Sequence, residues 1–123
     1  MILVDTSVWV EHLRSASAIL TELLGDREVL VHRFVIGELA LGNLRQRDAF
    51  LGELRDLPQA IVAEDEEVFR LIDREALFRR GIGYVDAHLL AAARLTAGSK
   101  LWTRNRRLQA VATQLGLAAA PAH

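Results

Sequence analysis

The first residues of the chain constrain its fold more than any other stretch. Residues 2–4, Ile-Leu-Val, form a short run of branched apolar side chains, which predicts a strand buried on both faces. Asp5 ends this run, and Thr6 and Ser7 follow it with hydroxyl groups suited to a helix N-terminus. A carboxylate is therefore expected at the carboxyl end of a central parallel strand, where open α/β sheets bind their ligands. Taken alone, Asp5 is explained equally well as an ordinary residue at a helix start.

Composition and charge narrow the class of protein. The length of 123 residues predicts one domain, residues 1–123, and the 51% of hydrophobic residues predicts a proper core. The net charge of −1 excludes binding driven by a globally basic surface, and the absence of cysteine excludes disulfides and thiolate metal sites. There is neither a basic leader nor an apolar stretch of about eighteen residues, so we expect a cytoplasmic protein without a membrane span.

Short apolar runs alternate with helical patterns along the rest of the chain. Further strands are predicted at residues 29–31, 60–62 and 100–103, with an optional edge strand at 117–120. Helices are predicted after Asp5 and at residues 18–24, 34–44, 46–57, 64–80, 85–97 and 105–115. The helix at 34–44 is apolar nearly all round, which predicts its burial. Strands that alternate with helices imply a parallel sheet covered on both faces, so the predicted fold is a three-layer α/β/α sandwich.

Glu38 is a candidate functional residue because its sequence neighbours are strongly apolar. A glutamate is almost never fully buried unless it is paired, and an unpaired buried carboxylate costs several kcal/mol or changes its pKa. The adjacent Gly37 costs roughly 1 kcal/mol of helix propensity relative to alanine, which suggests that another group approaches closely there. The alternative is a carboxylate paired with a structural arginine.

Two more polar residues stand at predicted helix starts. Asp86 opens the alanine-rich helix, where the helix dipole alone would favour an acid. Asn105 follows the strand at 100–103, where an ordinary N-cap would explain it. We expect His88 to be a packed or capping histidine rather than a ligand, and Trp9 and Trp102 to belong to the core.

Taken in order along the chain, these residues resemble the signature of the PIN-domain nucleases, and most closely that of the VapC toxins of bacterial toxin–antitoxin pairs. The stretches that carry the resemblance are Val4–Trp9, Val35–Leu39, Val85–Ala91 and Leu101–Asn105. They extend over essentially the whole chain, and their order is more specific than any one of them. The resemblance implies a PIN-like fold, endoribonuclease activity on RNA, a VapB-like antitoxin, and a homodimer or a toxin–antitoxin hetero-oligomer.

The resemblance also implies the roles of individual residues. Asp5, Glu38 and Asp86 correspond to the family's metal-binding and catalytic acids. Asn105 stands where many members carry a fourth catalytic aspartate. An amide offers a carbonyl oxygen to a hard cation but brings no charge, so the choice between one and two metal ions stays open.

Elementary electrostatics gives a separate reason to expect a cation. Two carboxylates about 4 Å apart repel each other by roughly 4 kcal/mol at an effective dielectric constant of 20. Three converging carboxylates must therefore bind a divalent ion, hold a proton or attract an arginine. A set of oxygen ligands favours Mg²⁺ or Mn²⁺ over zinc, and such an ion can activate a water molecule for attack on a phosphodiester.

The surroundings of these acids supply further candidates. Ser7 and Thr103 are expected to donate hydrogen bonds to the metal-binding carboxylates. The RNA-binding candidates flank Asn105 at a helix start, where positive charge opposes the helix dipole: Arg104, Arg106 and Arg107. Phosphate groups of RNA would explain that placement, and ordinary solvated arginines would explain it as well.

Two amphipathic segments are candidates for a surface that binds a partner. By the resemblance, the amphipathic segments Ala18–Leu24 and Gln46–Leu57 could bound a groove for a helix of the antitoxin.

The main alternative to a nuclease is a PIN-fold binding module without turnover, which Asn105 keeps open. A phosphoacceptor receiver domain is disfavoured because Asp5 has no adjacent acid and Lys100 precedes its strand, and an Asp-Xaa-Asp phosphatase is excluded by Ser7.

Overall fold

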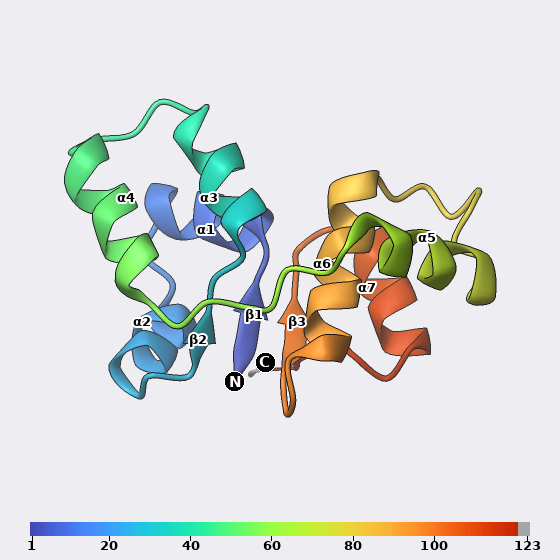
Figure 1. Cartoon of the computed structure of the whole chain (residues 1–123). Helices are drawn as coiled ribbons and strands as arrows, with labels where there is room; N and C mark the ends of the chain where they lie inside the picture. Colours follow the sequence, from blue (N-terminus) through green and yellow to red (C-terminus); the bar gives the residue numbers. More distant parts are fainter. Residues whose placement is uncertain (121–123) are drawn as a thin grey trace.

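Three parallel strands form the centre of the molecule, with β1 between β2 and β3 (Figure 1). The computed structural model describes residues 1–120. In chain order the elements are β1 (Ile2–Val4), α1 (Thr6–Arg14), α2 (Ala18–Gly25), β2 (Val29–Leu30), α3 (Arg33–Ala40), α4 (Arg47–Asp56), α5 (Asp65–Arg74), α6 (Tyr84–Leu95), β3 (Lys100–Trp102) and α7 (Arg106–Gln114). Helices α1 to α4 lie toward the β2 side in Figure 1, and α5 to α7 lie toward the β3 side. The predicted α/β sandwich with a central parallel sheet is confirmed.

The central strand is buried because its neighbours leave it no exposed edge. Leu3 pairs with Leu30 on one side and with Leu101 on the other, and all three side chains are buried. Trp9 and Trp102 also belong to the core, as predicted. Within residues 1–120, none of the helices is both long and apolar enough to cross a membrane.

The prediction of a strand at residues 60–62 is wrong. Pairing in this region is reduced to a single parallel bridge between Val31 and Gln59. Ile61 is half exposed, and its backbone N–H donates to Thr96 Oγ1 rather than to a strand partner. The optional edge strand at 117–120 is likewise a single bridge, between Leu101 and Ala118. Apolar residues in a row thus do not form a strand where a side chain takes the backbone hydrogen bond.

Two helices end earlier than the sequence predicts. Helix α5 ends at Arg74 rather than at residue 80, because Ala76 adopts a left-handed φ of 51° and Leu77 N donates to Ile72 O at 2.9 Å. Leu77 remains buried, so the apolar pattern continues past the end of the helix. Helix α3 ends at Ala40, and the Leu41 side chain beyond it is 90% exposed.

A buried histidine begins helix α3. His32 Nδ1 accepts a hydrogen bond from Phe34 N at 3.0 Å, and the ring is fully buried against the Phe34 ring. Burial lowers the pKa of His32 to about 4, with smaller contributions from His88 and Arg33. The folded protein therefore favours the neutral ring.

Replacing His32 with asparagine should remove part of the protein's acid sensitivity. Asparagine Oδ1 can accept the same hydrogen bond from Phe34 N, but the side chain does not titrate. Because the pKa of His32 is lower in the folded state, neutral His32 contributes to the free energy of unfolding. That contribution is complete above pH 6.5 and is lost as the pH falls toward 4. A pKa change of this size corresponds to about 3 kcal/mol.

Urea unfolding at several pH values between 4 and 7 measures this effect. We expect the free energy of unfolding to fall less steeply with acid in His32→Asn than in the wild-type protein. Identical pH profiles for the two proteins would contradict a buried, neutral His32.

Candidate active site

Asp5 lies between the end of β1 and the start of α1, and only 6% of its surface is exposed. Its backbone N–H donates to Trp102 O at 2.9 Å, which extends the pairing of β1 with β3 by one residue. Its Oδ2 accepts hydrogen bonds from Ser7 Oγ at 2.6 Å and from Thr103 Oγ1 at 2.8 Å, and a longer one from Ser7 N at 3.4 Å. Asp5 is therefore both the N-cap of α1 and a carboxylate fixed at the sheet edge.

The two hydroxyl groups on Asp5 also hold the segment that follows β3. Ser7 Oγ accepts from Arg104 N at 2.9 Å, and Thr103 Oγ1 accepts from Asn105 N at 3.0 Å. Each hydroxyl thus donates to the carboxylate and accepts from the backbone, which fixes the direction of its proton. Ser7 and Thr103 make the contacts with the acid that the sequence led us to expect.

Asp86 stands in the first turn of α6, and its Oδ2 accepts a hydrogen bond from Gly83 N at 2.9 Å. Burial raises the pKa of this carboxyl, and the negative charge of Asp5 raises it further, whereas the Gly83 hydrogen bond opposes both effects. The influence of Asp5 means that two carboxylates, one at the N-cap of α1 and one in the first turn of α6, are close enough to interact.

Glu38 approaches the same region from α3. Its Oε1 accepts a hydrogen bond from Thr6 Oγ1 at 2.6 Å, so it is held beside the residue that follows Asp5. Thr6 was predicted only as a residue of a helix start, although its position next to Asp5 could have suggested this contact.

The expected environment of Glu38 is wrong. Both Gly37 and Glu38 are exposed, since only one face of α3 packs against the core. Nothing in the described part of the chain lies within 4 Å of a Cβ placed on Gly37, so no group approaches it closely. Among residues 1–120, Glu38 has no arginine within ion-pair distance, and the structural-pair alternative is wrong as well.

The acids partly fit a divalent cation. Across residues 1–120, no three His, Asp or Glu side chains converge in an arrangement that could hold a metal ion. Asp5 and Asp86 are nevertheless neighbours, and each uses only its Oδ2 in hydrogen bonds with the described residues. Mg²⁺ is commonly held by one or two carboxylates and keeps several water ligands, so this pair of oxygen donors suits it. The predicted participation of Glu38 as a ligand stays a prediction.

Asn105 is the N-cap of α7. Its Oδ1 accepts hydrogen bonds from Arg107 N at 3.0 Å and from Leu108 N at 3.1 Å. These contacts are the ones expected of an ordinary cap. The carbonyl oxygen that would face a cation is engaged with the helix backbone, and a catalytic role for Asn105 stays a prediction.

The three arginines around Asn105 are exposed and differ in their contacts. Arg104 forms an ion pair with Glu11 at 3.1 Å and lies over the Trp102 ring at 5.5 Å. The side chain of Arg107 lies against Gly81, where an added Cβ would meet its Cδ at 2.7 Å. Contacts within the protein thus account for the position of Arg104 without a phosphate group.

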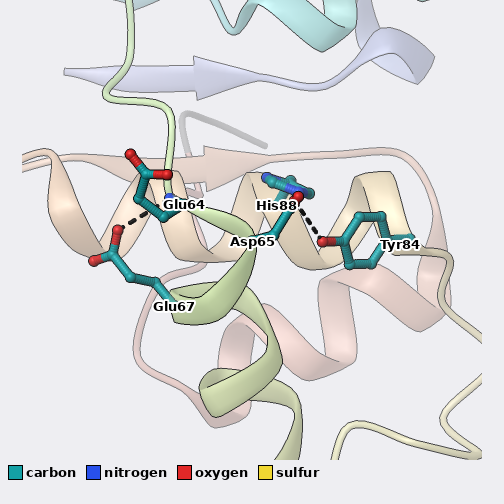
Figure 2. Close-up of polar contacts among 5 residues, drawn as sticks. All are labelled: Glu64, Asp65, Glu67, Tyr84 and His88. Atoms are coloured by element: carbon teal, nitrogen blue, oxygen red, sulfur yellow. Dashed lines mark hydrogen bonds and ion pairs between the residues drawn. The ribbon is translucent and has the colours of Figure 1, made fainter.

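His88 is a packed residue, as predicted, and Figure 2 shows it beside Asp65 and Tyr84. It is buried in α6, and its Nε2 lies 3.3 Å from Asp65 Oδ1. The Tyr84 hydroxyl donates to the same oxygen at 2.8 Å. Asp65 therefore joins the start of α5 to the start of α6, a role that its place in an acidic helix start did not reveal.

Comparisons with known proteins agree with this arrangement. A family model described as "PIN domain" matches residues 2–114. Two proteins named "Ribonuclease VapC32", from two strains of Mycobacterium tuberculosis, are each 53% identical to the chain over 120 residues, which is 98% of this chain and 97% of theirs. The crystal structure of PAE2754 from Pyrobaculum aerophilum superposes with a TM-score of 0.58 over 89% of this chain and 78% of that one. Its sequence identity of 22% supports the fold alone.

Neutralising Asp86 should stabilise the metal-free protein. Because the folded state raises the pKa of this carboxyl, ionised Asp86 lowers stability once the pH exceeds that pKa. Asp86→Asn removes the charge but keeps an oxygen acceptor for Gly83 N. We expect a gain on the order of 0.5 kcal/mol at pH 7 in EDTA, a modest value because solvent screens a half-buried group.

Chemical unfolding of both proteins in EDTA checks this expectation. Asp48, a first-turn acid of α4, offers a matched control, and Asp48→Asn should bring no gain because the helix dipole favours that charge. A loss of stability in Asp86→Asn would mean that the two carboxylates do not strain the folded state.

Proposed function

Because the chain belongs to the PIN-domain family, we propose that it is a divalent-metal-dependent endoribonuclease of the VapC toxin type, neutralised by a VapB-like antitoxin. The observation that carries the proposal is Asp5, a buried carboxylate that Ser7 and Thr103 hold at the carboxyl end of β1, with the charge of Asp86 close enough to interact with it. The name of the relatives, "Ribonuclease VapC32", supports RNA as the substrate, and their 53% identity extends over nearly the full length of both chains.

Asp5 and Asp86 would hold a Mg²⁺ or Mn²⁺ ion, with Glu38 as the third acid. The bound ion would supply Lewis acidity, which neutralises charge on the phosphodiester and makes an attacking water more acidic. Ser7 and Thr103 fix the orientation of Asp5 through their hydrogen bonds to its Oδ2. Glu38 is exposed, and among residues 1–120 only Thr6 holds its side chain, so it remains able to orient a water molecule or to accept its proton.

The RNA would reach this site across the exposed arginines that surround Asn105. The planar guanidinium group suits phosphate oxygens, and the net charge of −1 means that such contacts must be local. We assign Arg106 and Arg107 to the phosphate backbone. Arg104 would have to exchange its ion pair with Glu11 for a phosphate, so its contribution should be weaker.

An antitoxin would inhibit most directly by covering Glu38. A hollow of about 310 Å³ between α1 and α3 is lined by Val10, Leu13 and Leu39, and Glu38 forms part of its wall. An apolar helix with one basic side chain suits such a surface. A second hollow, of about 280 Å³, lies near Leu24 and Leu57, at the ends of the two segments for which a groove was predicted. We propose that the protein assembles as a homodimer or, with its antitoxin, as an inactive toxin–antitoxin hetero-oligomer.

One observation favours a second candidate, a binding module without turnover. The Asn105 side chain brings no charge, and its carbonyl oxygen already accepts two backbone hydrogen bonds. A site with fewer acids holds a second cation less well. Such a protein would bind RNA and leave it intact.

Cleavage of a panel of structured RNAs tests the proposal. We expect cutting by the wild-type protein in Mg²⁺ or Mn²⁺ and none in EDTA. Asp5→Asn and Asp86→Asn should each lower the rate by roughly a hundredfold or more, because each removes charge from the group that stabilises the reacting phosphate. Circular dichroism establishes that the variants are folded.

Asp26→Asn serves as the matched control, since Asp26 is an exposed acid at the end of α2. It should cut like the wild-type protein. Undiminished cleavage by Asp86→Asn, or cleavage in EDTA, would contradict the proposal. Binding of RNA without cutting under any metal condition would support the binding module instead.

A further inference from the structure

The segment that joins α5 to α6 has an unusual backbone. Three of its residues, Ala76, Arg79 and Gly81, have φ values of 51°, 64° and 77°. Left-handed φ values are unfavourable for residues other than glycine, so two of these positions carry backbone strain. Leu77 is buried, and the next side chain, Phe78, is 59% exposed. The segment is thus fixed to the core by Leu77 and, in part, by Ile82, while it presents an aromatic ring to solvent.

A small apolar hollow lies between this segment and α6. Its volume is about 190 Å³, and its walls include Ile72, Leu77, Phe78, Ile82, Gly83 and Tyr84. Pockets for drug-sized ligands span roughly 300–1,000 Å³, so this hollow suits one planar ring system rather than a larger molecule.

The hollow is adjacent to the proposed active site. Gly83, which lines it, donates its backbone N–H to Asp86 Oδ2 at 2.9 Å. Tyr84 follows Gly83, and Asp65 holds the hydroxyl of Tyr84 in place at 2.8 Å (Figure 2). The Tyr84 ring also packs edge-on against His88 and lies beside Phe69. One aromatic wall of the hollow is therefore held rigidly within two residues of a catalytic acid.

Arginines lie along the same segment, while Asp65 and Glu66 act on Tyr84 at its end. Arg79 and Arg80 belong to it, and the Arg107 side chain lies across Gly81. Arg80 Nη1 donates to Gln114 Oε1 at 2.7 Å. Neither Arg79 nor Arg107 forms an ion pair with a carboxylate in residues 1–120. The hollow itself is lined by apolar and aromatic residues, and Arg79 directly follows one of them, Phe78. This combination matches a nucleotide, which combines a flat ring with an anionic backbone.

We propose that this hollow, which we call the Phe78 subsite, binds one nucleobase of the RNA next to the bond that is cut. The base stacks on Phe78 or Tyr84 while its phosphate neighbours contact Arg79 and Arg107. The inference rests on the proposed ribonuclease function and adds to it a place where the base beside the cleaved bond is read. An apolar side chain from a second copy of the protein would fill the same hollow, but it would form no ion pair with the arginines.

Abasic substitution of an RNA that the wild-type protein cleaves tests the subsite. A set of oligonucleotides carries an abasic nucleotide at each position near the cleaved bond, and kcat/KM is measured for each. We expect one abasic position to lower kcat/KM of the wild-type protein by roughly tenfold or more, because base–aromatic stacking is lost there. Phe78→Ala should lower kcat/KM on the intact RNA by a similar factor and should be insensitive to that abasic position.

Phe78→Tyr keeps an aromatic face and should behave like the wild-type protein. Leu41→Ala is the matched control, since Leu41 is an exposed apolar residue outside the subsite. Equal effects of the abasic position in the wild-type protein and in Phe78→Ala would overturn the subsite, as would a change in oligomeric state without a change in cleavage. If the wild-type protein cuts no RNA, the proposed function fails and the subsite fails with it.

Discussion

Two hydroxyl-to-carboxylate hydrogen bonds on one oxygen of Asp5 hold the candidate site together. Ser7 donates from the first turn of α1, and Thr103 donates from a residue 98 positions further along the chain than Asp5. Both hydroxyls also accept from the backbone of the segment that begins α7. Without these bonds, a buried carboxylate would lack compensation for its lost hydration, and the ends of β1 and β3 would be joined by backbone hydrogen bonds alone. Asp5 is thus part of the fold and of the site at once.

The same arrangement places like charges together. Burial raises the pKa of Asp86, which stands at the start of α6, and the negative charge of Asp5 raises it further. The helix dipole and the Gly83 N–H offset part of the repulsion. Groups that destabilise a folded protein and share one edge of a sheet are typical of a functional site. A divalent cation would turn this repulsion into attraction, which is the physical reason for assigning one to these acids.

Sequence patterns predicted features that depend on local chemistry. The strand at 2–4 follows from its branched apolar residues, and Ser7 and Thr103 were expected to donate to the acid. The cap at Asn105 had been named only as the alternative to a catalytic role. The absence of a strand at 60–62 could not be predicted, because the side chain of Thr96 takes the backbone hydrogen bond of Ile61. The early end of α5 could not be predicted either, because Ala76 adopts a conformation that alanine rarely shows.

The environment of the site residues was harder to predict than their positions. The apolar neighbours of Glu38 in the sequence suggested burial, yet a short helix at the surface exposes one face whatever its composition. The hydrogen bond from Thr6 to Glu38 and the fastening of α5 to α6 by Asp65 depend on how helices pack, which no local pattern encodes. The hollow beside Phe78 has the same origin, because it exists only where the segment after α5 folds back toward α6.

The central claim is that Asp5 and Asp86 together hold a divalent cation. Calorimetric titration of the metal-free protein with Mn²⁺ at neutral pH tests it most directly, since it needs neither an RNA substrate nor turnover. We expect saturable binding to the wild-type protein and a loss of that binding in a variant that carries both Asp5→Asn and Asp86→Asn. Equal Mn²⁺ affinity in the two proteins would contradict the claim.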